Sequence, residues 1–261
     1  MNDPETGALA GKLVVVTGAR GGQGLAEAYG LASAGATVVA VDAQRPEAAD
    51  GIEPIELDVT DETGWRALAA HIDAQYGRVD GLVNNAGVAF RTQSATRLEH
   101  LQVERWNRTL AVNVTGPMLA MRSLRTLMTA GGSVLNVGSV AALTGHAAMS
   151  YATSKWALRG LTQSAATQLG PAGIRVNAIH PGYIETGMTA DAPSTLRGAM
   201  VGLTPLGRPG VPEDLVAAVV FFMSDASSFI TGAELAVDGG YLHGAHAMHI
   251  AAQAGGRSPA T

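Results

Sequence analysis

The sequence predicts an α/β fold in which a parallel sheet carries helices on both faces. Short β-branched runs alternate with helical patterns along the chain, and this alternation is typical of parallel sheets. The first run, KLVVVT at residues 12–17, is almost entirely apolar, as expected of a strand buried on both faces. No linker, composition break or internal repeat divides the 261 residues, so we expect one domain.

Seven strands and five helices are expected in alternation. The strands are expected at residues 12–17, 37–42, 54–59, 79–84, 133–138, 175–179 and 234–237, and the helices at residues 25–34, 61–76, 104–128, 151–169 and 212–223. Asp61 is a suitable N-cap, Pro212 suits a first helical turn, and a bend is expected at Gly116-Pro117. The domain at residues 12–240 lies between a flexible N-terminal tail (1–11) and a C-terminal tail (241–261), a candidate subunit contact.

The composition narrows the classes of function. Charged residues make up only 15% of the chain, which suggests that other subunits cover part of its surface. The net charge of −5 and the lack of a basic run make nucleic acid an unexpected partner. The absence of cysteine excludes disulfides, thiolate catalysis and cysteine metal sites. The N-terminus has no signal segment and no apolar run reaches the roughly 18 residues of a membrane helix, so we expect a cytoplasmic protein.

Three glycines follow the first strand. Gly18, Gly22 and Gly24 lie in the turn before a helix, where glycine permits positive φ and lets a diphosphate approach the backbone. The free N–H groups of the helix N-terminus would then face the phosphates. A tight turn without a ligand is the alternative, because the spacing is G-x-x-x-G-x-G. Asp42 ends the second strand and favours the cofactor, since a carboxylate there can accept hydrogen bonds from the adenosine ribose hydroxyls.

The charges near this turn bear on the choice of dinucleotide. Asp42 would repel a 2′-phosphate, so we expect NAD rather than NADP. Arg20 and Arg45 leave some use of NADP open. Asp58, at the end of the third expected strand, has two interpretations of equal weight: contact with the adenine amino group, or a cap of the next helix.

A hydroxyl, a phenol and an ammonium group lie close together in SVAALTGHAAMSYATSK, residues 139–155. If the segment from residue 151 is helical, Tyr151 and Lys155 lie on one face, one turn apart. An ammonium group beside a phenol favours the phenolate, and a phenol with a lowered pKa can exchange protons near neutral pH. Such a pair also arises by chance, and Ser139 alone would be interpreted as a turn residue, so their meaning depends on the rest of the chain.

With these motifs in place, the chain resembles the short-chain dehydrogenase/reductase family. The matching motifs lie in the family's order over about residues 12–240: Thr17-Gly18-x-x-x-Gly22-x-Gly24, Asp58-Val59, Asn84-Asn85-Ala86-Gly87, Asn113, Ser139, Tyr151-x-x-x-Lys155, and Pro181-Gly182 followed by Thr186. One departure is Gly138, where many relatives carry a second serine; we expect it to affect substrate fit. The resemblance implies a Rossmann-type, doubly wound, seven-stranded parallel sheet and a homotetramer.

The resemblance also assigns roles to residues. Tyr151 is the expected acid/base, and Lys155 lowers its pKa and holds the nicotinamide ribose. Ser139 would orient the substrate oxygen, and Asn113 would support a water that links Lys155 to solvent. A hydride passes between nicotinamide and substrate carbon, so no metal is needed. The residues expected at the cofactor are Gly18, Arg20, Gly22, Gln23, Gly24, Asp42, Asp58, Val59, Asn85, Ala86, Gly87, Tyr151, Lys155, Pro181, Gly182, Ile184 and Thr186.

The expected substrate is a secondary alcohol or its ketone. The expected pocket wall is mostly apolar, which favours a bulky neutral ring, steroid- or terpenoid-like; it includes Phe90, Val140, His146, Met149 and Tyr183. Segments at residues 180–190, 204–208 and 227–240 resemble bacterial hydroxysteroid dehydrogenases. We therefore predict an NAD-dependent secondary-alcohol dehydrogenase. The alternatives are an NADPH-dependent ketoreductase, such as a 3-ketoacyl-carrier reductase, and a non-catalytic NAD-binding sensor.

Four further histidines could in principle have a catalytic or metal-binding role. His180 is expected to be structural, because Tyr151 already fills the acid/base role. His243, His246 and His249 have the spacing of metal ligands but no acidic neighbour, so we expect a solvated or interface tail and no metal.

Overall fold

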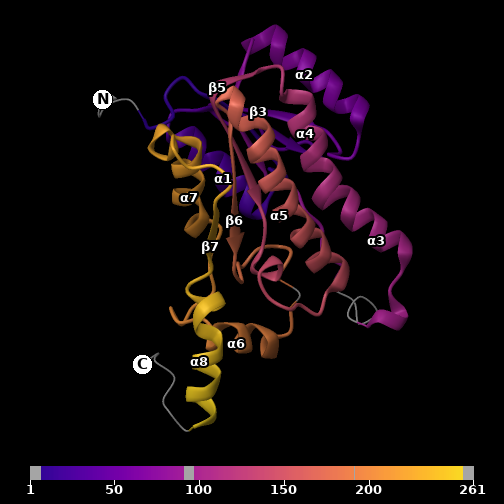
Figure 1. Cartoon of the computed structure of the whole chain (residues 1–261), viewed down its shortest axis with the longest axis vertical. Coiled ribbons are helices and arrows are strands. Elements are labelled where there is room, and N and C mark those ends of the chain that lie inside the picture. Colours follow the sequence, from indigo (N-terminus) through magenta and orange to yellow (C-terminus); the bar gives the residue numbers. More distant parts are fainter. Residues whose placement is uncertain (1–6, 91–96, 191, 255–261) are drawn as a thin grey trace.

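The expected parallel sheet is present. The computed structural model describes residues 7–90, 97–190 and 192–254. In this part of the chain, seven strands form one sheet in the order β3-β2-β1-β4-β5-β6-β7, and every neighbouring pair is parallel. Helices lie on both sides of this sheet in Figure 1, which confirms the doubly wound, Rossmann-type fold.

Strands and helices alternate along the chain. The strands are β1 (Leu13–Thr17), β2 (Thr37–Asp42), β3 (Ile52–Glu56), β4 (Val79–Asn84), β5 (Met128–Val137), β6 (Arg175–Pro181) and β7 (Glu234–Val237). The α-helices are α1 (Gly22–Ser33), α2 (Glu62–Tyr76), α3 (Val103–Leu110), α4 (Gly116–Leu124), α5 (Met149–Leu169), α6 (Ser194–Gly202), α7 (Glu213–Met223) and α8 (Tyr241–Gln253). Asp61 caps α2 as expected, because its side chain accepts a hydrogen bond from the Thr63 N–H.

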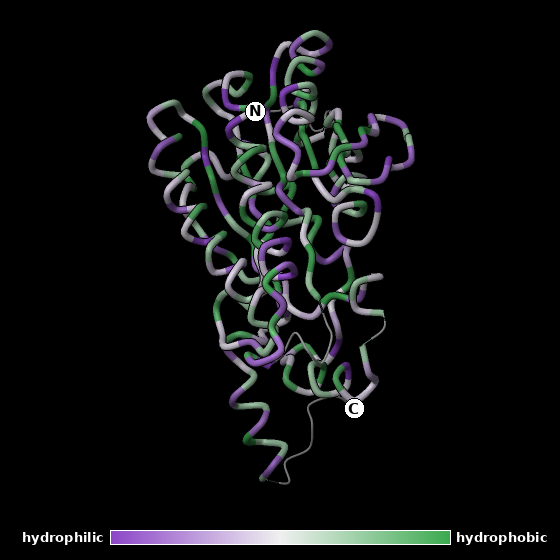
Figure 2. Tube along the Cα trace, turned by 90° about the vertical axis from the view of Figure 1, so that its right-hand side faces the viewer, coloured by the Kyte–Doolittle hydropathy of each residue, from purple (hydrophilic) through white to green (hydrophobic). Residues whose placement is uncertain are grey.

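The two faces of the sheet have separate apolar cores. Helices α1 and α7 pack together against one face, over residues such as Val16 and Val137. Helices α2, α4 and α5 cover the other face, where Trp65 is fully buried. All five residues of β1 are buried, which explains its β-branched sequence without polar alternation. The interior strands are accordingly mostly green in the hydropathy colours of Figure 2.

Strands β3 and β5 differ most from their predicted bounds, whereas β1 and β6 differ by one or two residues at one end. Strand β3 begins at Ile52, which pairs with Val38, and ends before Asp58 and Val59, so these two residues lie in the following turn. Asp58 stabilises this turn by accepting hydrogen bonds from the backbone and hydroxyl of Thr60. Strand β5 begins at residue 128 rather than 133, across a register shift in its pairing with β4.

The long helix predicted at residues 104–128 is interrupted directly before Gly116-Pro117, where a bend was expected. A π-helical segment, Ala111–Thr115, joins α3 to α4, and the helix ends at Leu124. Pro117 has no N–H to donate to the carbonyl of Asn113, four residues earlier, which explains why the irregularity precedes the proline. The wider turn contains Asn113, one of the expected site residues.

Both expected tails contain structure. Leu9 is buried and its N–H donates to the carbonyl of Ala34, so residues 7–11 pack on the domain rather than forming a loose tail. Residues 241–253 form helix α8, which has no buried residue and extends beyond the rest of the fold (Figures 1 and 2). The remainder of the two tails, residues 1–6 and 255–261, lies outside the described residues. None of the helices in the described ranges is long and apolar enough to cross a membrane.

Candidate active site

The glycine turn forms a compact cradle at the carboxyl end of β1. Gly18 has φ +70°, and a Cβ atom there would lie 2.8 Å from the Cα of Ala86. A Cβ at Gly24 would lie 2.2 Å from the carbonyl oxygen of Gly18, so α1 approaches the turn too closely for any other residue. The side chain of Asn85 ties this arrangement together by donating to the carbonyls of Thr17 and Gly18 over 3.1 and 3.2 Å. The backbone is therefore shaped for close approach of a diphosphate.

The N-terminus of α1 is open to such a group. The helix has no side-chain cap, so its first N–H groups remain available to an anion, and Gln23 is its second residue. Gly22 has φ +56°, and a Cβ there would lie 3.4 Å from the Cβ of Thr186. The structure thus brings the glycine turn and the loop after β6 together, as the cofactor assignment requires.

Asp42 lies at the end of β2, beside the glycine turn. Its carboxylate accepts hydrogen bonds from the backbone N–H groups of Arg20, over 3.3 Å, and Gln44, over 3.2 Å. The side chain of Arg20 is exposed. These contacts hold Asp42 where a carboxylate can receive the ribose hydroxyls of a dinucleotide. The glycine cradle, the open helix end and Asp42 together fit a nicotinamide dinucleotide.

Asp58 and Val59 have structural partners. Partial burial acts to raise the pKa of Asp58, but hydrogen bonds from Thr60 and the Arg108 guanidinium outweigh it and hold this pKa below its usual value. Arg108 lies 3.0 Å from Asp58 through Nη2. The cap expected for α2 comes from Asp61 instead, so Asp58 does not cap that helix. Val59 is buried and its carbonyl accepts the Trp65 indole N–H. Contact of Asp58 with adenine stays a prediction.

Tyr151 and Lys155 both lie on α5, as the spacing predicts. The Nζ of Lys155 is 5.7 Å from the centroid of the Tyr151 ring and donates to the carbonyl of Val137 over 2.8 Å. Lys155 is buried, and this burial lowers the pKa of its ammonium to about 8, against the opposing effect of Glu27. A buried cation beside the phenol favours the phenolate of Tyr151.

Gly87 and Asn113 surround the same ammonium group. A Cβ at Gly87 would lie 3.5 Å from both the Asn113 Oδ1 and the Lys155 Nζ. Asn113 accepts from the Val88 N–H and donates to the Val88 carbonyl and the Ser154 hydroxyl, over 2.8, 3.0 and 2.9 Å. Asn113 therefore joins the loop after β4 to α5 beside Lys155, whereas its role toward a water stays a prediction.

Ser139 follows β5 and caps a short 3₁₀ turn, Val140–Ala142. Its hydroxyl oxygen accepts from the Ala141 N–H over 3.2 Å, and its own N–H donates to Nδ1 of His180 over the same distance. Because Oγ already accepts from the backbone, its hydrogen remains available for donation to a substrate oxygen.

The loop after β6 is held against β7. Pro181 ends β6, and the N–H of Gly182 donates to the carbonyl of Val237 over 3.0 Å. A Cβ at Gly182 would lie 2.8 Å from the Cα of Asp238, so glycine is required. The side chain of Ile184 is buried. These contacts fix the position of the segment expected at the nicotinamide.

The expected substrate residues are only partly brought together. The His146 ring lies 6.0 Å from the Tyr151 ring, and Met149 begins α5 just before it. Val140 is buried, and Phe90 lies under the Arg105 guanidinium at 5.6 Å. His146 therefore lies near the Tyr151 ring.

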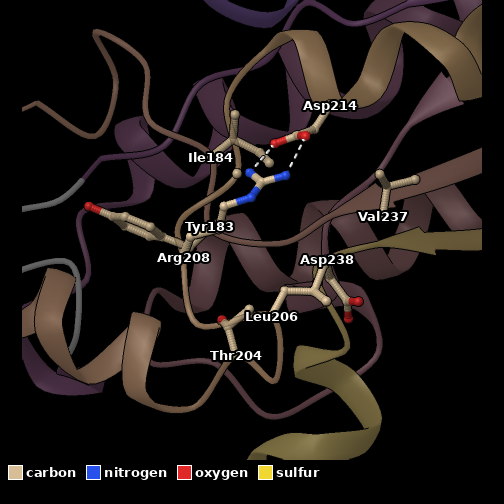
Figure 3. A pocket seen from close by; sticks show the side chains of 10 residues that line it. Tyr183, Ile184, Thr204, Leu206, Arg208, Asp214, Val237 and Asp238 are labelled. Atoms are coloured by element: carbon tan, nitrogen blue, oxygen red, sulfur yellow. Dashed lines mark hydrogen bonds and ion pairs between the residues drawn. The ribbon is translucent and has the colours of Figure 1, made fainter. Parts of the chain in front are cut away.

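A cavity of about 220 Å³ lies next to the loop after β6 (Figure 3). Its wall includes Tyr183 but neither Tyr151 nor Ser139, so the cavity is separate from these two side chains. Arg208 and Asp214 form a two-bond ion pair in it, over 2.6 and 2.7 Å. Among the residues that the structure describes, no cluster of His, Asp and Glu could hold a metal ion.

Glu27 is a site-proximal residue that the sequence reasoning missed. It lies on α1, is fully buried, and its burial raises the pKa of the carboxyl group to about 8, with Lys155 acting in the opposite direction. A signal was present, because Glu27 falls on the buried stripe of α1 with Gly24 and Leu31 at helical spacing. A glutamate on such a stripe is unusual and marks a buried ionisable group.

The comparisons with known proteins agree with this geometry. The family model described as enoyl-(acyl carrier protein) reductase matches residues 18–242. The chain is 40% identical over 248 residues to the cis-4-hydroxycyclohexanecarboxylate dehydrogenase of Sinomonas cyclohexanicum, covering 90% of this chain and 98% of the relative. It is 38% identical over 249 residues to the 3-alpha-(or 20-beta)-hydroxysteroid dehydrogenase of Mycobacterium tuberculosis, covering 92% of each.

A solved structure extends the comparison to three dimensions. A candidate NAD(P)-dependent gluconate 5-dehydrogenase of Beutenbergia cavernae, with NADP bound at low occupancy, superimposes with a TM-score of 0.80 at 36% identity. The match covers 90% of this chain and 98% of the other. The fold, the glycine cradle, the Tyr151-Lys155 pair and the relatives all indicate the same family. The chain belongs to the short-chain dehydrogenase/reductase family of oxidoreductases.

Proposed function

We propose that the protein oxidises a secondary alcohol on a bulky ring to the ketone, reversibly, with NAD as the hydride acceptor. The observation that carries this proposal is the placement of the buried Lys155 ammonium beside the Tyr151 phenol, with Ser139 held at the end of the neighbouring strand. This arrangement can exchange one proton with the substrate and bind the substrate oxygen, and alcohol–ketone interconversion requires both.

The residues of the chain divide the proton chemistry between them. Tyr151, as the phenolate favoured by Lys155, accepts the hydroxyl proton of the alcohol. Ser139 donates its hydroxyl hydrogen to the same substrate oxygen and so fixes its position. Lys155 stays oriented through the Val137 carbonyl. The dinucleotide, when bound at the glycine cradle, supplies the acceptor for the hydride.

The preference for NAD is inferred from Asp42. Its carboxylate faces the glycine turn through the Arg20 and Gln44 N–H groups, where a 2′-phosphate would bring further negative charge. The exposed Arg20 side chain favours the alternative, an NADPH-dependent ketoreductase, because a cation at this edge could pair with that phosphate. A non-catalytic sensor is disfavoured by the intact Tyr151-Lys155 pair.

A ring-shaped substrate is supported by two relatives whose names specify cyclic alcohols, one a substituted cyclohexane and the other a steroid. The His146 ring lies near the Tyr151 ring and is tilted against it, and Met149 presents an exposed apolar side chain at the start of α5. We further propose a homotetramer in the cytoplasm. Exposed apolar side chains on separate parts of the surface, such as Trp156 and Phe229, support an assembly that covers them.

The proposal is tested with the purified protein and a panel of cyclohexanols, hydroxysteroids and short acyclic alcohols, each with NAD and with NADP. We expect turnover of the cyclic alcohols with NAD. Tyr151→Phe should lower kcat by about a hundredfold or more while NAD binding, measured by calorimetry, is retained. Activity on acyclic alcohols alone would contradict the proposed substrate class. Full activity of Tyr151→Phe would contradict the proposed mechanism.

A further inference from the structure

His180 lies beneath the loop that carries Ser139. It is the sixth residue of β6 and is 1% exposed. A Cβ at Gly138 would lie 2.4 Å from Nδ1 and 2.7 Å from Cε1 of this imidazole. The ring therefore fills the space that a side chain at residue 138 would occupy, which explains why glycine and not serine precedes Ser139.

The charges around the ring indicate its neutral tautomer. The Glu234 carboxylate lies nearest to Nε2 and favours a proton on that nitrogen, which leaves Nδ1 to accept from the Ser139 backbone N–H over 3.2 Å. The carbonyl oxygen of Ser139 is 3.1 Å from the same nitrogen. Both backbone groups of Ser139 thus surround one atom, and the protonation of that atom decides which of them it can bind.

The ion pair of Glu234 and Arg159 lies near Nε2 of His180. Nε2 lies 3.6 Å from Oε1 of Glu234, an ion-pair distance but too long for a direct hydrogen bond. Glu234 is held by Arg159 through two bonds of 2.7 and 2.8 Å, and Arg159 also donates to the carbonyl of Ala142 over 3.0 Å. The network therefore joins β7 and α5 to both ends of the turn that Ser139 begins.

We propose that His180, oriented by Glu234 and Arg159, is a positioning residue that holds Ser139 ready to contact the substrate oxygen, and that protonation of its imidazole moves this contact from the N–H to the carbonyl of Ser139 and so displaces Ser139. This inference rests on the proposed function only through the contact of Ser139 with substrate. The hydrogen-bond switch itself belongs to the protein alone.

The charges around the ring set the direction of its pH dependence. Burial lowers the pKa of His180, while Glu234 and the Ser139 backbone act to raise it and Arg159 acts to lower it. The ring is therefore neutral at neutral pH. In acid, Nδ1 becomes a donor, loses the Ser139 N–H and turns to the Ser139 carbonyl, so activity should show an acid limb that originates at His180.

The tautomer is tested first, without cofactor or turnover. Nitrogen-15 NMR of the histidine side chains in the apoprotein, with His180→Asn used to assign the resonance, should show the Nε2–H form at neutral pH. It should change to the doubly protonated form in acid. A proton on Nδ1 at neutral pH would overturn the proposal whatever the protein's substrate.

The positioning role is tested by paired variants. Asparagine places an oxygen close to the site of Nδ1, so His180→Asn keeps an acceptor for the Ser139 N–H but cannot titrate. We expect this variant to retain kcat near neutral pH and to lose the acid limb, whereas His180→Ala should lower kcat/KM about tenfold with unchanged NAD affinity. Glu234→Gln, which removes the charge that favours the imidazolium, should move the acid limb to lower pH.

A matched control distinguishes positioning from a general histidine effect. His71 also contacts a carboxylate, Glu53, over 2.7 Å, but lies on α2 away from Ser139. His71→Asn should leave the pH profile unchanged. An acid limb that persists in His180→Asn, or equal rates for His180→Asn and His180→Ala, would refute the proposed role.

Discussion

Glu27 offers a sharp test of how this fold tolerates a buried ionisable group. Its side chain is completely buried in α1, and neither carboxyl oxygen has a hydrogen-bond partner among the described residues. Burial raises its pKa from 4.5 to about 8, and Lys155 opposes this shift. Glu27→Gln keeps the size and shape of the side chain and removes its titration. The variant should therefore alter the pH dependence of stability rather than the fold.

The sign of the effect follows from the two pKa values. The folded protein holds the proton more tightly than the unfolded chain, so this contribution to stability is fully present below pH 4.5 and is lost as the pH rises through about 8. One pKa unit corresponds to about 1.4 kcal/mol, so the loss amounts to about 3 kcal/mol by pH 7 and at most about 5 kcal/mol above pH 8. Lys155 behaves oppositely, because its lowered pKa restores stability as the pH rises from about 8 toward 10.5.

The measurement is urea unfolding of wild type and Glu27→Gln at a series of pH values from about 5 to about 8, at one protein concentration. The wild type should lose several kcal/mol relative to the variant over this range. Glu56→Gln, at the exposed end of β3, is the matched control and should follow the wild type. Parallel stability curves for wild type and Glu27→Gln would refute the argument that Glu27 is held protonated.

The remaining predictions concern the cofactor cradle. Gly24→Ala places a methyl group against the Gly18 carbonyl and should weaken NAD binding at least tenfold by calorimetry, whereas Gly21→Ala, with no atom within 4 Å of the added Cβ, should bind normally. Equal binding by both variants would contradict the close approach of α1 to the turn. Asp42→Ser should raise the NADP to NAD ratio of kcat/KM by about tenfold or more, since it removes the negative charge near the 2′ position; an unchanged ratio would show that another group selects the dinucleotide.

The elements predicted most accurately are those whose sequence is dictated by burial. The bounds of β2 and β4 agree with the prediction residue for residue, because runs such as TVVAVD lie between both apolar cores and cannot be polar. The bounds of β7 also agree, although none of its residues is buried. Helix α8 was missed because none of its residues is buried, so no apolar stripe marks it. The early start of β5 was missed because residues 129–131, including Gly131 at φ +93°, are exposed and resemble a turn.

In the candidate site too, some features could be predicted from local sequence and others could not. The placement of Gly18, Gly24 and Lys155 could be predicted from the sequence, because it depends on backbone conformation and on helical spacing. The roles of His180 and Glu27 depend on contacts between distant elements, since His180 meets Ser139 across 41 positions of the chain and Glu27 reaches Lys155 from another helix. Such contacts leave no local periodicity. Only the glycine at residue 138 hinted at the first of them.

The topology of the sheet explains why the cofactor half of the site is more predictable than the substrate half. The strand order reverses between β1 and β4, so the chain leaves these neighbouring strands toward opposite faces. The glycine turn and the loop after Asn85 diverge there, and their backbones must pass so closely that the fold itself demands glycine at residues 18 and 24. No comparable demand acts on the loop near His146, where a Cβ at Gly145 would meet no atom within 4 Å. Substrate preference therefore has to be measured, whereas the place of the dinucleotide follows from the strand order.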